Sequence, residues 1–168
     1  IVPIDKELEA DDIEYLLTDS ESKAIFYSKT YFDIIDDLKA KELPGVEYFS
    51  FKKLPKMIEE GKKLLSEGYT EYIDSIPSRD DLASIVYTSG TTGKSKGVML
   101  SHGNIMSDMY AAACNVTIYG SSILLLPLHH AFGLTAGLFA VMSYGEMLYI
   151  NKSLKKVIVY IDKCFCCC

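Results

Sequence analysis

Residues 82–100 read LASIVYTSGTTGKSKGVML, and they combine two apolar runs with a loop rich in glycine and hydroxyl residues. An apolar strand pattern at Leu82 to Tyr87 runs directly into glycines, hydroxyl residues and lysines, and Val98 to Leu100 then resumes an extended pattern. Glycines allow positive φ and close approach of the backbone, so that successive N–H groups can point at one anion. The segment from Thr88 to Gly97 therefore predicts a hairpin between two strands that binds a polyphosphate.

This loop combines backbone donors, hydroxyl donors and positive charge, and it contains no acidic residue that would repel a phosphate. The candidate ligand-binding residues are Thr88, Ser89, Gly90, Thr91, Thr92, Gly93, Lys94 and Lys96. A flexible Ser/Gly linker is the alternative interpretation, but linkers do not usually lie between two apolar strands. A phosphate-binding loop is the favoured prediction.

The sequence Gly93-Lys94-Ser95 also resembles the end of a Walker loop. That loop needs a glycine five residues before Gly93, where this chain has Thr88. In a Walker loop a helix begins at the lysine and its N-terminus holds the phosphate, whereas here strand residues follow Gly97. The sequence therefore excludes a Walker loop.

Helical and strand patterns alternate along the rest of the chain. Apolar helical stripes are predicted within residues 13–17, 31–38, 54–65, 105–113 and 134–142, with Asp11 and Asp12 capping the first. Strands are predicted at residues 24–27, 46–51, 82–87, 123–126 and 147–150, and residues 1–5 begin the chain within an apolar strand. Such alternation predicts an α/β protein, here part of a doubly wound, mainly parallel sheet. The polar stretch 69–81 is predicted to be a surface connector at a subdomain junction.

Composition excludes several classes of protein. With 168 residues, 49% of them hydrophobic and 24% charged, the chain is a folded domain rather than a disordered one. Its net charge of -6 argues against nucleic acid as a partner. No charged residue occurs at 109–145, but Pro127 and several glycines interrupt this run, so it predicts two buried elements rather than a transmembrane span.

The two ends depart from the pattern of a complete protein. The chain begins with Ile1 and shows no signal peptide pattern, which predicts that upstream sequence is missing. Residues 158–168 form a divergent tail with four of the chain's five cysteines, whose adjacency disfavours a disulfide framework and a metal site. Prenylation is disfavoured because Phe165 interrupts the usual arrangement. Truncation or a shifted reading frame is the favoured interpretation of this tail.

Residues 87–102, YTSGTTGKSKGVMLSH, resemble the signature phosphate loop of the AMP-forming acyl-CoA synthetases, which belong to the adenylate-forming superfamily. Ser95 stands where these enzymes usually carry proline. Residues 126–133, LPLHHAFG, are similar to a second motif of the family, and residues 2–26 resemble it too. The resemblance covers residues 1–157, a partial AMP-binding domain.

The resemblance implies a ligase that uses ATP and Mg²⁺ to convert a carboxylic acid, expected to be a fatty acid, into an acyl-adenylate. The acyl group then passes to coenzyme A. The loop would hold the β and γ phosphates, with Lys96 as their charge partner and Lys94 at a position where the family varies. The Thr88 hydroxyl would contact Mg²⁺ or phosphate, and His130 would border the acyl and adenylate pocket. Without the resemblance, His129 and His130 read as packed side chains that point to opposite faces of a strand.

Other motifs of the family do not occur here, since the sequence has no aromatic-Gly-x-Thr-Glu segment and no Thr-Gly-Asp. The isolated chain is therefore expected to lack ligase activity. Two alternatives stay open, a non-catalytic nucleotide-binding module and a truncated product without function. Exposed sheet edges predict self-association or aggregation, and the expected location is cytoplasmic or peripheral to a membrane.

Overall fold

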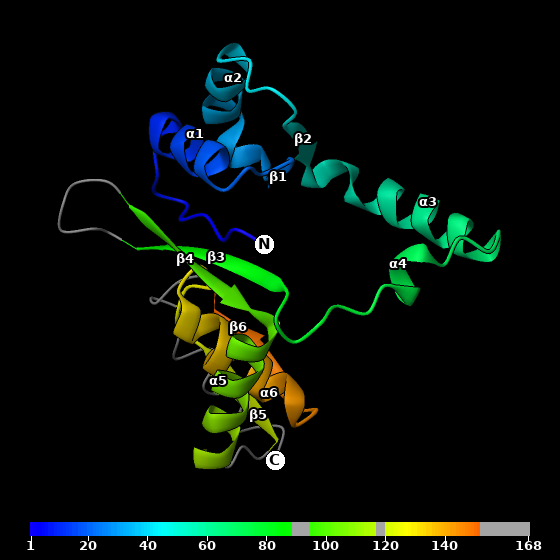
Figure 1. Cartoon of the computed structure of the whole chain (residues 1–168), viewed down its shortest axis with the longest axis vertical. Helices are drawn as coiled ribbons and strands as arrows, with labels where there is room; N and C mark the ends of the chain where they lie inside the picture. The colour runs from blue at the N-terminus through cyan, green and yellow to red at the C-terminus, as the bar shows by residue number, and fades with distance from the viewer. Residues whose placement is uncertain (89–94, 117–119, 152–168) are drawn as a thin grey trace. The chain divides into compact units, whose positions relative to one another are not determined.

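The computed structural model describes residues 1–88, 95–116 and 120–151 (Figure 1). The chain forms two compact units, one of Val2–Pro77 and one that combines Ile1 with the chain from Ser78 onward. The boundary between them falls within the polar stretch 69–81. The cysteine-rich tail and the loop residues 89–94 lie outside the described residues.

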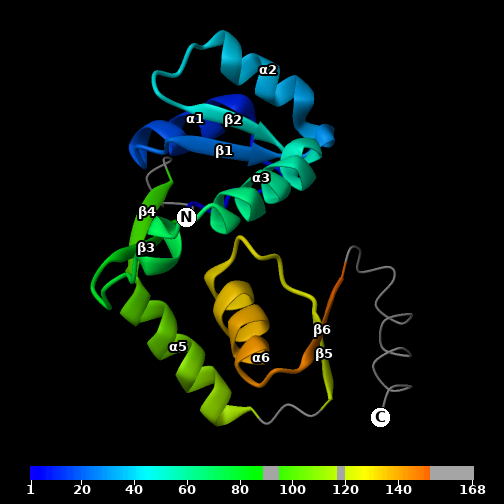
Figure 2. The same ribbon diagram turned by 90° about the vertical axis from the view of Figure 1, so that its right-hand side faces the viewer.

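The unit Val2–Pro77 alternates helices with two strands. Its elements are α1 (Ala10–Asp19), β1 (Ala24–Tyr27), the 3₁₀ turn η1 (Lys29–Tyr31), α2 (Phe32–Ala40), β2 (Glu47–Ser50), the 3₁₀ turn η2 (Phe51–Lys53), α3 (Leu54–Ser66) and α4 (Glu71–Asp74). β1 and β2 pair in parallel, with Ala24 opposite Glu47 and Tyr27 opposite Ser50 (Figure 2). α2 connects the two strands, so this part of the chain is a β–α–β unit.

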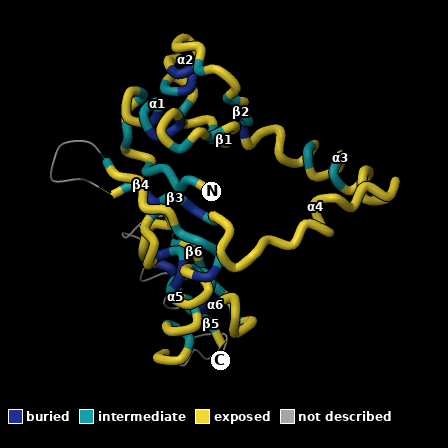
Figure 3. Tube along the Cα trace, in the orientation of Figure 1, coloured by how far each residue is buried: buried dark blue, intermediate teal, exposed yellow. Residues whose placement is uncertain are grey.

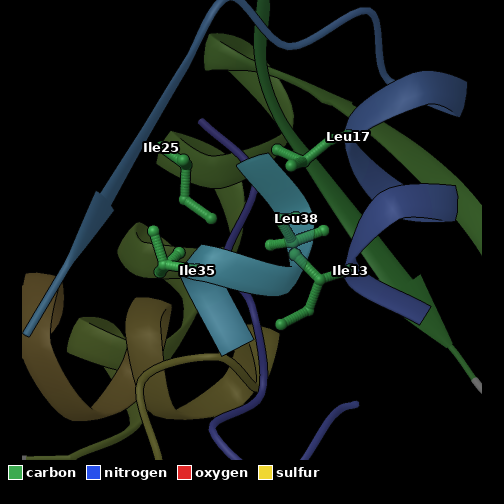
Figure 4. Packing of buried hydrophobic residues seen from close by; sticks show 5 residues of the cluster. All are labelled: Ile13, Leu17, Ile25, Ile35 and Leu38. Carbon is green, nitrogen blue, oxygen red and sulfur yellow. The ribbon is translucent and has the colours of Figure 1, made fainter. Parts of the chain in front are cut away.

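The core of this unit lies between α1, α2 and β1 (Figure 4). Its five buried members are Ile13, Leu17, Ile25, Ile35 and Leu38. The helical members recur at the three- and four-residue spacing of one helix face, which confirms the stripes predicted for α1 and α2. Burial of these side chains is the main source of stability for the unit.

The start of α1 differs from the prediction. Asp11 and Asp12 do not cap the helix; Glu9 occupies the N-cap position and makes no side-chain cap bond. Both aspartates lie in the first turn, where a negative charge favours the helix through its macrodipole.

α3 forms where the sequence predicts it and ends in a Schellman motif at Gly68, which has φ of 91°. The Gly68 N–H donates to the Leu65 carbonyl at 3.1 Å, and the Tyr69 N–H donates to the Leu64 carbonyl at 3.1 Å. Lys63 forms an ion pair with Glu67 at 3.7 Å. No residue of α3 is buried, so its apolar stripe does not join the core (Figure 3).

The second unit begins with an antiparallel hairpin. Its elements are β3 (Leu82–Thr88), β4 (Lys96–Ser101), α5 (His102–Asn115), β5 (Ser121–Leu124), the π-helix η3 (Gly133–Phe139), α6 (Ala140–Ser143) and β6 (Met147–Ile150). β5 and β6 pair in parallel. Of the expected strand at residues 1–5, only Ile1 pairs: its N–H donates to the Ala83 carbonyl at 2.8 Å, and its carbonyl accepts from the Ile85 N–H at 3.0 Å.

The predicted α/β class, with parallel strand pairs, is confirmed. The described residues form three two-stranded sheets, of which the β3–β4 pair is antiparallel.

The buried stripe predicted for α5 is wrong, because Met106 is 55% and Tyr110 69% exposed. Cys114 is exposed too, and its hydrogen bond raises the pKa of the Tyr110 hydroxyl. Among the described residues, no helix combines the length and apolar character needed to cross a membrane.

Candidate functional site

Thr88 and Lys96 are the last paired residues of the β3–β4 hairpin and close the candidate phosphate loop. The strand-to-strand geometry predicted for this loop is therefore confirmed. Directly opposed residues of an antiparallel pair place their side chains on the same face, so the Thr88 hydroxyl and the Lys96 ammonium project from one side of the hairpin. Both residues are exposed, and the six candidates from Ser89 to Lys94 lie outside the described residues.

The other face of the hairpin explains why residue 97 is glycine. Tyr87 pairs with Gly97, and a Cβ atom at this glycine would lie 3.2 Å from the Tyr87 ring and 2.8 Å from Cγ2 of Ile85. The aromatic ring thus covers the backbone next to Lys96. This packing fixes the strand that carries the lysine, whereas the sequence pattern indicated only positive φ and close backbone approach to an anion for the glycines.

The N-terminus of α5 follows β4 directly, and its backbone donors are already used. Ser101 and Asn104 form a reciprocal capping box, with hydrogen bonds of 3.2 and 3.0 Å. The His102 N–H donates to the Asp81 carbonyl at 3.1 Å, and the Gly103 N–H donates to the Arg79 carbonyl at 2.7 Å. Phosphate binding at this helix end is therefore disfavoured.

The sequence indicated a strand at His129 and His130, but neither residue lies on one in the structure. β5 ends at Leu124, and both histidines belong to a turn in which the His130 N–H donates to the Pro127 carbonyl at 3.2 Å. Strand alternation does not apply in a turn, and the two rings lie together with centroids 4.5 Å apart. His130 is exposed and His129 half-buried. Among the described residues, no hydrogen bond joins His130 to Thr88 or Lys96.

The π-helix η3 begins three residues after this turn and is held close to it. A Cβ atom at Gly133 would lie 2.4 Å from the Pro127 carbonyl oxygen, and one at Gly137 would lie 2.4 Å from Cδ1 of Leu124. Buried Thr135 donates its hydroxyl to the Ala131 carbonyl at 3.0 Å. π-helical turns occur frequently at functional sites, and this one fixes the segment that follows His130.

A magnesium ion held mainly by phosphate oxygens and water needs only one or two oxygens from the protein. The exposed Thr88 hydroxyl at the paired end of the hairpin fits that requirement. Within the described part of the chain, no group of three or more His, Cys, Asp or Glu side chains could form a metal centre of its own.

Solved structures with the same fold define the class of protein. The N-terminal domain of FACL13 from Mycobacterium tuberculosis matches 93% of this chain and 39% of its own, with a TM-score of 0.73 and 27% identity. ATP-bound MatB from Rhodopseudomonas palustris matches 89% of this chain and 29% of its own, with a TM-score of 0.66 and 29% identity. Together with the hairpin motif, these likenesses define an α/β enzyme of the adenylate-forming class.

The chain belongs to the family of AMP-binding enzymes, whose model matches residues 1–162. The long-chain-fatty-acid–CoA ligase FadD13 of Mycobacterium tuberculosis is 31% identical over 143 residues, which are 84% of this chain and 28% of the relative. A long-chain-fatty-acid–CoA ligase of Haemophilus influenzae is 37% identical over 100 residues, which are 55% of this chain and 18% of the relative. The chain thus spans less than a third of the length of these curated relatives.

Proposed function

We propose that this chain carries the phosphate-binding part of an AMP-forming acid–thiol ligase. The proposed substrates are ATP, a carboxylic acid of the fatty acid class and coenzyme A. The observation that carries the proposal is the family's loop motif on a hairpin whose last paired residues are Thr88 and Lys96. The preference for a fatty acid rests on the ligases to which the chain is similar.

In the proposed site each described residue has one task. The Lys96 ammonium neutralises charge on the β and γ phosphates, and its interaction strengthens as pyrophosphate departs. The Thr88 hydroxyl supplies an oxygen to Mg²⁺ or donates to a phosphate. Mg²⁺, when bound, neutralises phosphate charge and orients the leaving group. Gly97 and Tyr87 hold the strand on which Lys96 lies. The loop residues Ser89, Gly90, Thr91, Thr92, Gly93 and Lys94 are the proposed further ligands of the phosphates.

His130 is proposed to border the acyl and adenylate pocket. Its support is the family motif at residues 126–133 and the close contact of its turn with η3. The ring of His129 lies against it and restricts its orientation.

Pyrophosphate exchange with ATP and a fatty acid tests the proposal. We expect the isolated chain to bind ATP but to show no exchange, because the sequence lacks the family's other ATP-binding motifs. A chimaera in which residues 1–162 replace the matching part of FadD13 should recover exchange that depends on the acid. Lys96→Ala in the chimaera should lower the exchange rate by roughly 10²- to 10³-fold.

The alternatives predict other outcomes. A non-catalytic nucleotide-binding module gives ATP binding by the isolated chain and a chimaera that binds ATP without exchange. A truncated product without function gives neither. Exchange by the isolated chain at the rate of a complete enzyme would contradict the expected inactivity.

A further inference from the structure

α3 presents an apolar stripe that nothing in its own unit covers. Leu54, Ile58 and Leu65 recur at the spacing of one helix face, and they are 38%, 49% and 47% exposed. Leu64 and Phe51 extend the stripe, with exposures of 48% and 49%. Figure 1 shows α3 leaving the end of β2 and running away from α1 and α2, and Figure 3 shows its surface to be mostly exposed.

The charge of this segment is opposite to that of the chain. Residues 51–67 carry five lysines and three glutamates, a net charge of +2, whereas the whole chain carries -6. Lys56 and Lys63 pair with Glu60 and Glu67 at 3.6 and 3.7 Å. In the described part of the chain, no ion pair is recorded for Lys53 or Lys62, so their charges remain available to an anionic partner.

An amphipathic helix with lysines, leucines and an aromatic residue at one end has the composition of helices that lie in the interface of a membrane. We propose that α3 with η2 is a docking surface for anionic lipid bilayers, with the stripe of Leu54, Ile58 and Leu65 entering the acyl boundary. The stripe spans about 16 Å along the helix, which suits an interfacial rather than a spanning position. Lys53 and Lys62 contact lipid phosphates.

A second copy of the chain is the less favoured occupant of this surface. Two α3 helices placed face to face would bring two segments of net charge +2 together, which opposes their association. An anionic bilayer instead attracts the same lysines and accepts the apolar stripe without a complementary shape. Near α3, the local positive charge therefore attracts an anionic bilayer more strongly than the net negative charge of the whole chain repels it.

Fluorescence of a single tryptophan tests the proposal, because the native chain contains none. Ile58→Trp in the full 168-residue chain should show a blue-shifted emission and co-sediment with vesicles that contain roughly a third phosphatidylserine. Pure phosphatidylcholine vesicles and high salt should reduce the binding by roughly tenfold. Replacing Leu54, Ile58 and Leu65 together by serine should reduce vesicle binding by roughly tenfold or more.

Two matched controls distinguish vesicle binding through this surface from nonspecific hydrophobic binding by other parts of the chain. Serine at Met99, Met106 and Met142, which lie on other elements and are even more exposed, should leave vesicle binding unchanged. Lys53→Glu with Lys62→Glu should weaken binding, whereas Lys6→Glu with Lys23→Glu should not. Circular dichroism should show that all variants retain their helices, since every replaced side chain is exposed.

Three results would overturn the proposal. The first is vesicle binding that the serine variant of α3 retains. The second is equal binding to neutral and anionic vesicles. The third is self-association, measured by light scattering without lipid, that disappears in the α3 variant while no variant binds vesicles; the surface would then belong to a second copy. None of these results bears on ATP binding, so failure here leaves the proposed function intact.

Discussion

The carbonyl oxygen of Pro127 lies 2.4 Å from the position that a Cβ atom at Gly133 would take. Backbone atoms cannot move aside as the end of a side chain can, so the turn that carries His129 and His130 requires glycine at the start of η3. The turn and the π-helix are therefore in direct contact, through Pro127 and Gly133, which are only six residues apart in the sequence.

Gly133→Ala should destabilise the chain by roughly 1–3 kcal/mol, because the added methyl group forces the turn and η3 apart. Gly61→Ala in α3 is the matched control, since no atom lies within 4 Å of the added Cβ. That change should stabilise α3 by roughly 0.5–1 kcal/mol through the better helix propensity of alanine. Urea unfolding of both variants measures the difference. Equal effects of the two substitutions would contradict the contact.

Leu38→Ala should cost roughly 2–5 kcal/mol of unfolding free energy, because Leu38 is 0% exposed in the core of the unit Val2–Pro77. Leu64→Ala removes the same atoms from a side chain that is 48% exposed and should change stability by only about 0.5 kcal/mol. Denaturant titration compares the two. Similar losses would show that α3 packs in solution as α2 does.

Asp11→Asn should change the acid sensitivity of the chain. The Lys41 ammonium hydrogen-bonds to the Asp11 carboxylate and to Glu14, and this lowers the pKa of Asp11 below its usual 3.8. A lowered folded-state pKa gives stability that is present above the unfolded pKa and is lost as the pH falls through the folded one. The same contacts raise the pKa of Lys41, so its contribution is present below the unfolded value of 10.5 and is lost as the pH rises through the raised folded pKa.

Thermal unfolding measured between pH 5 and roughly 2 tests this coupling. The native chain should lose stability over this range by more than the Asp11→Asn variant does. Asp12→Asn is the control, because Asp12 shares the first turn of α1 and its macrodipole but has no recorded ion pair in the described residues. A response of the Asp12 variant equal to that of the Asp11 variant would assign the effect to the helix dipole.

Ser101→Ala should cost about 1 kcal/mol, because it removes the hydroxyl that caps α5 and leaves the Asn104 N–H without its acceptor. Ser107→Ala, on the exposed middle of the same helix, should have little effect or a slight benefit. Hydrogen exchange at the first turn of α5 should accelerate only in the Ser101 variant. Unchanged exchange would mean that the Asp81 and Arg79 carbonyls hold the helix start unaided.

Local spacing made part of this fold predictable. Ile13 and Leu17, like Ile35 and Leu38, lie on one face of a single helix, so the sequence alone places them in a core. The hairpin was predictable too, because two apolar runs flank a segment rich in glycine. In both cases the information lies within a few residues.

Other features depend on contacts that the spacing of apolar residues along the sequence does not reveal. α3 has the spacing of a core helix, yet Ile58 is 49% exposed because no element of its unit packs on the stripe. The mutual placement of His129 and His130 depends on a turn that Pro127 begins where the sequence indicated a strand. The role of Gly97 depends on the Tyr87 ring across the hairpin.

In the proposed function, the paired end of the β3–β4 hairpin binds the phosphates of ATP. Phosphorus-31 NMR of MgATP titrated with the 168-residue chain measures this binding at the phosphates themselves. We predict shifts of the β and γ resonances larger than that of the α resonance, and affinity roughly tenfold weaker in Lys96→Ala but unchanged in Lys62→Ala. Absence of any shift, or a response that both lysine variants retain, would contradict the claim.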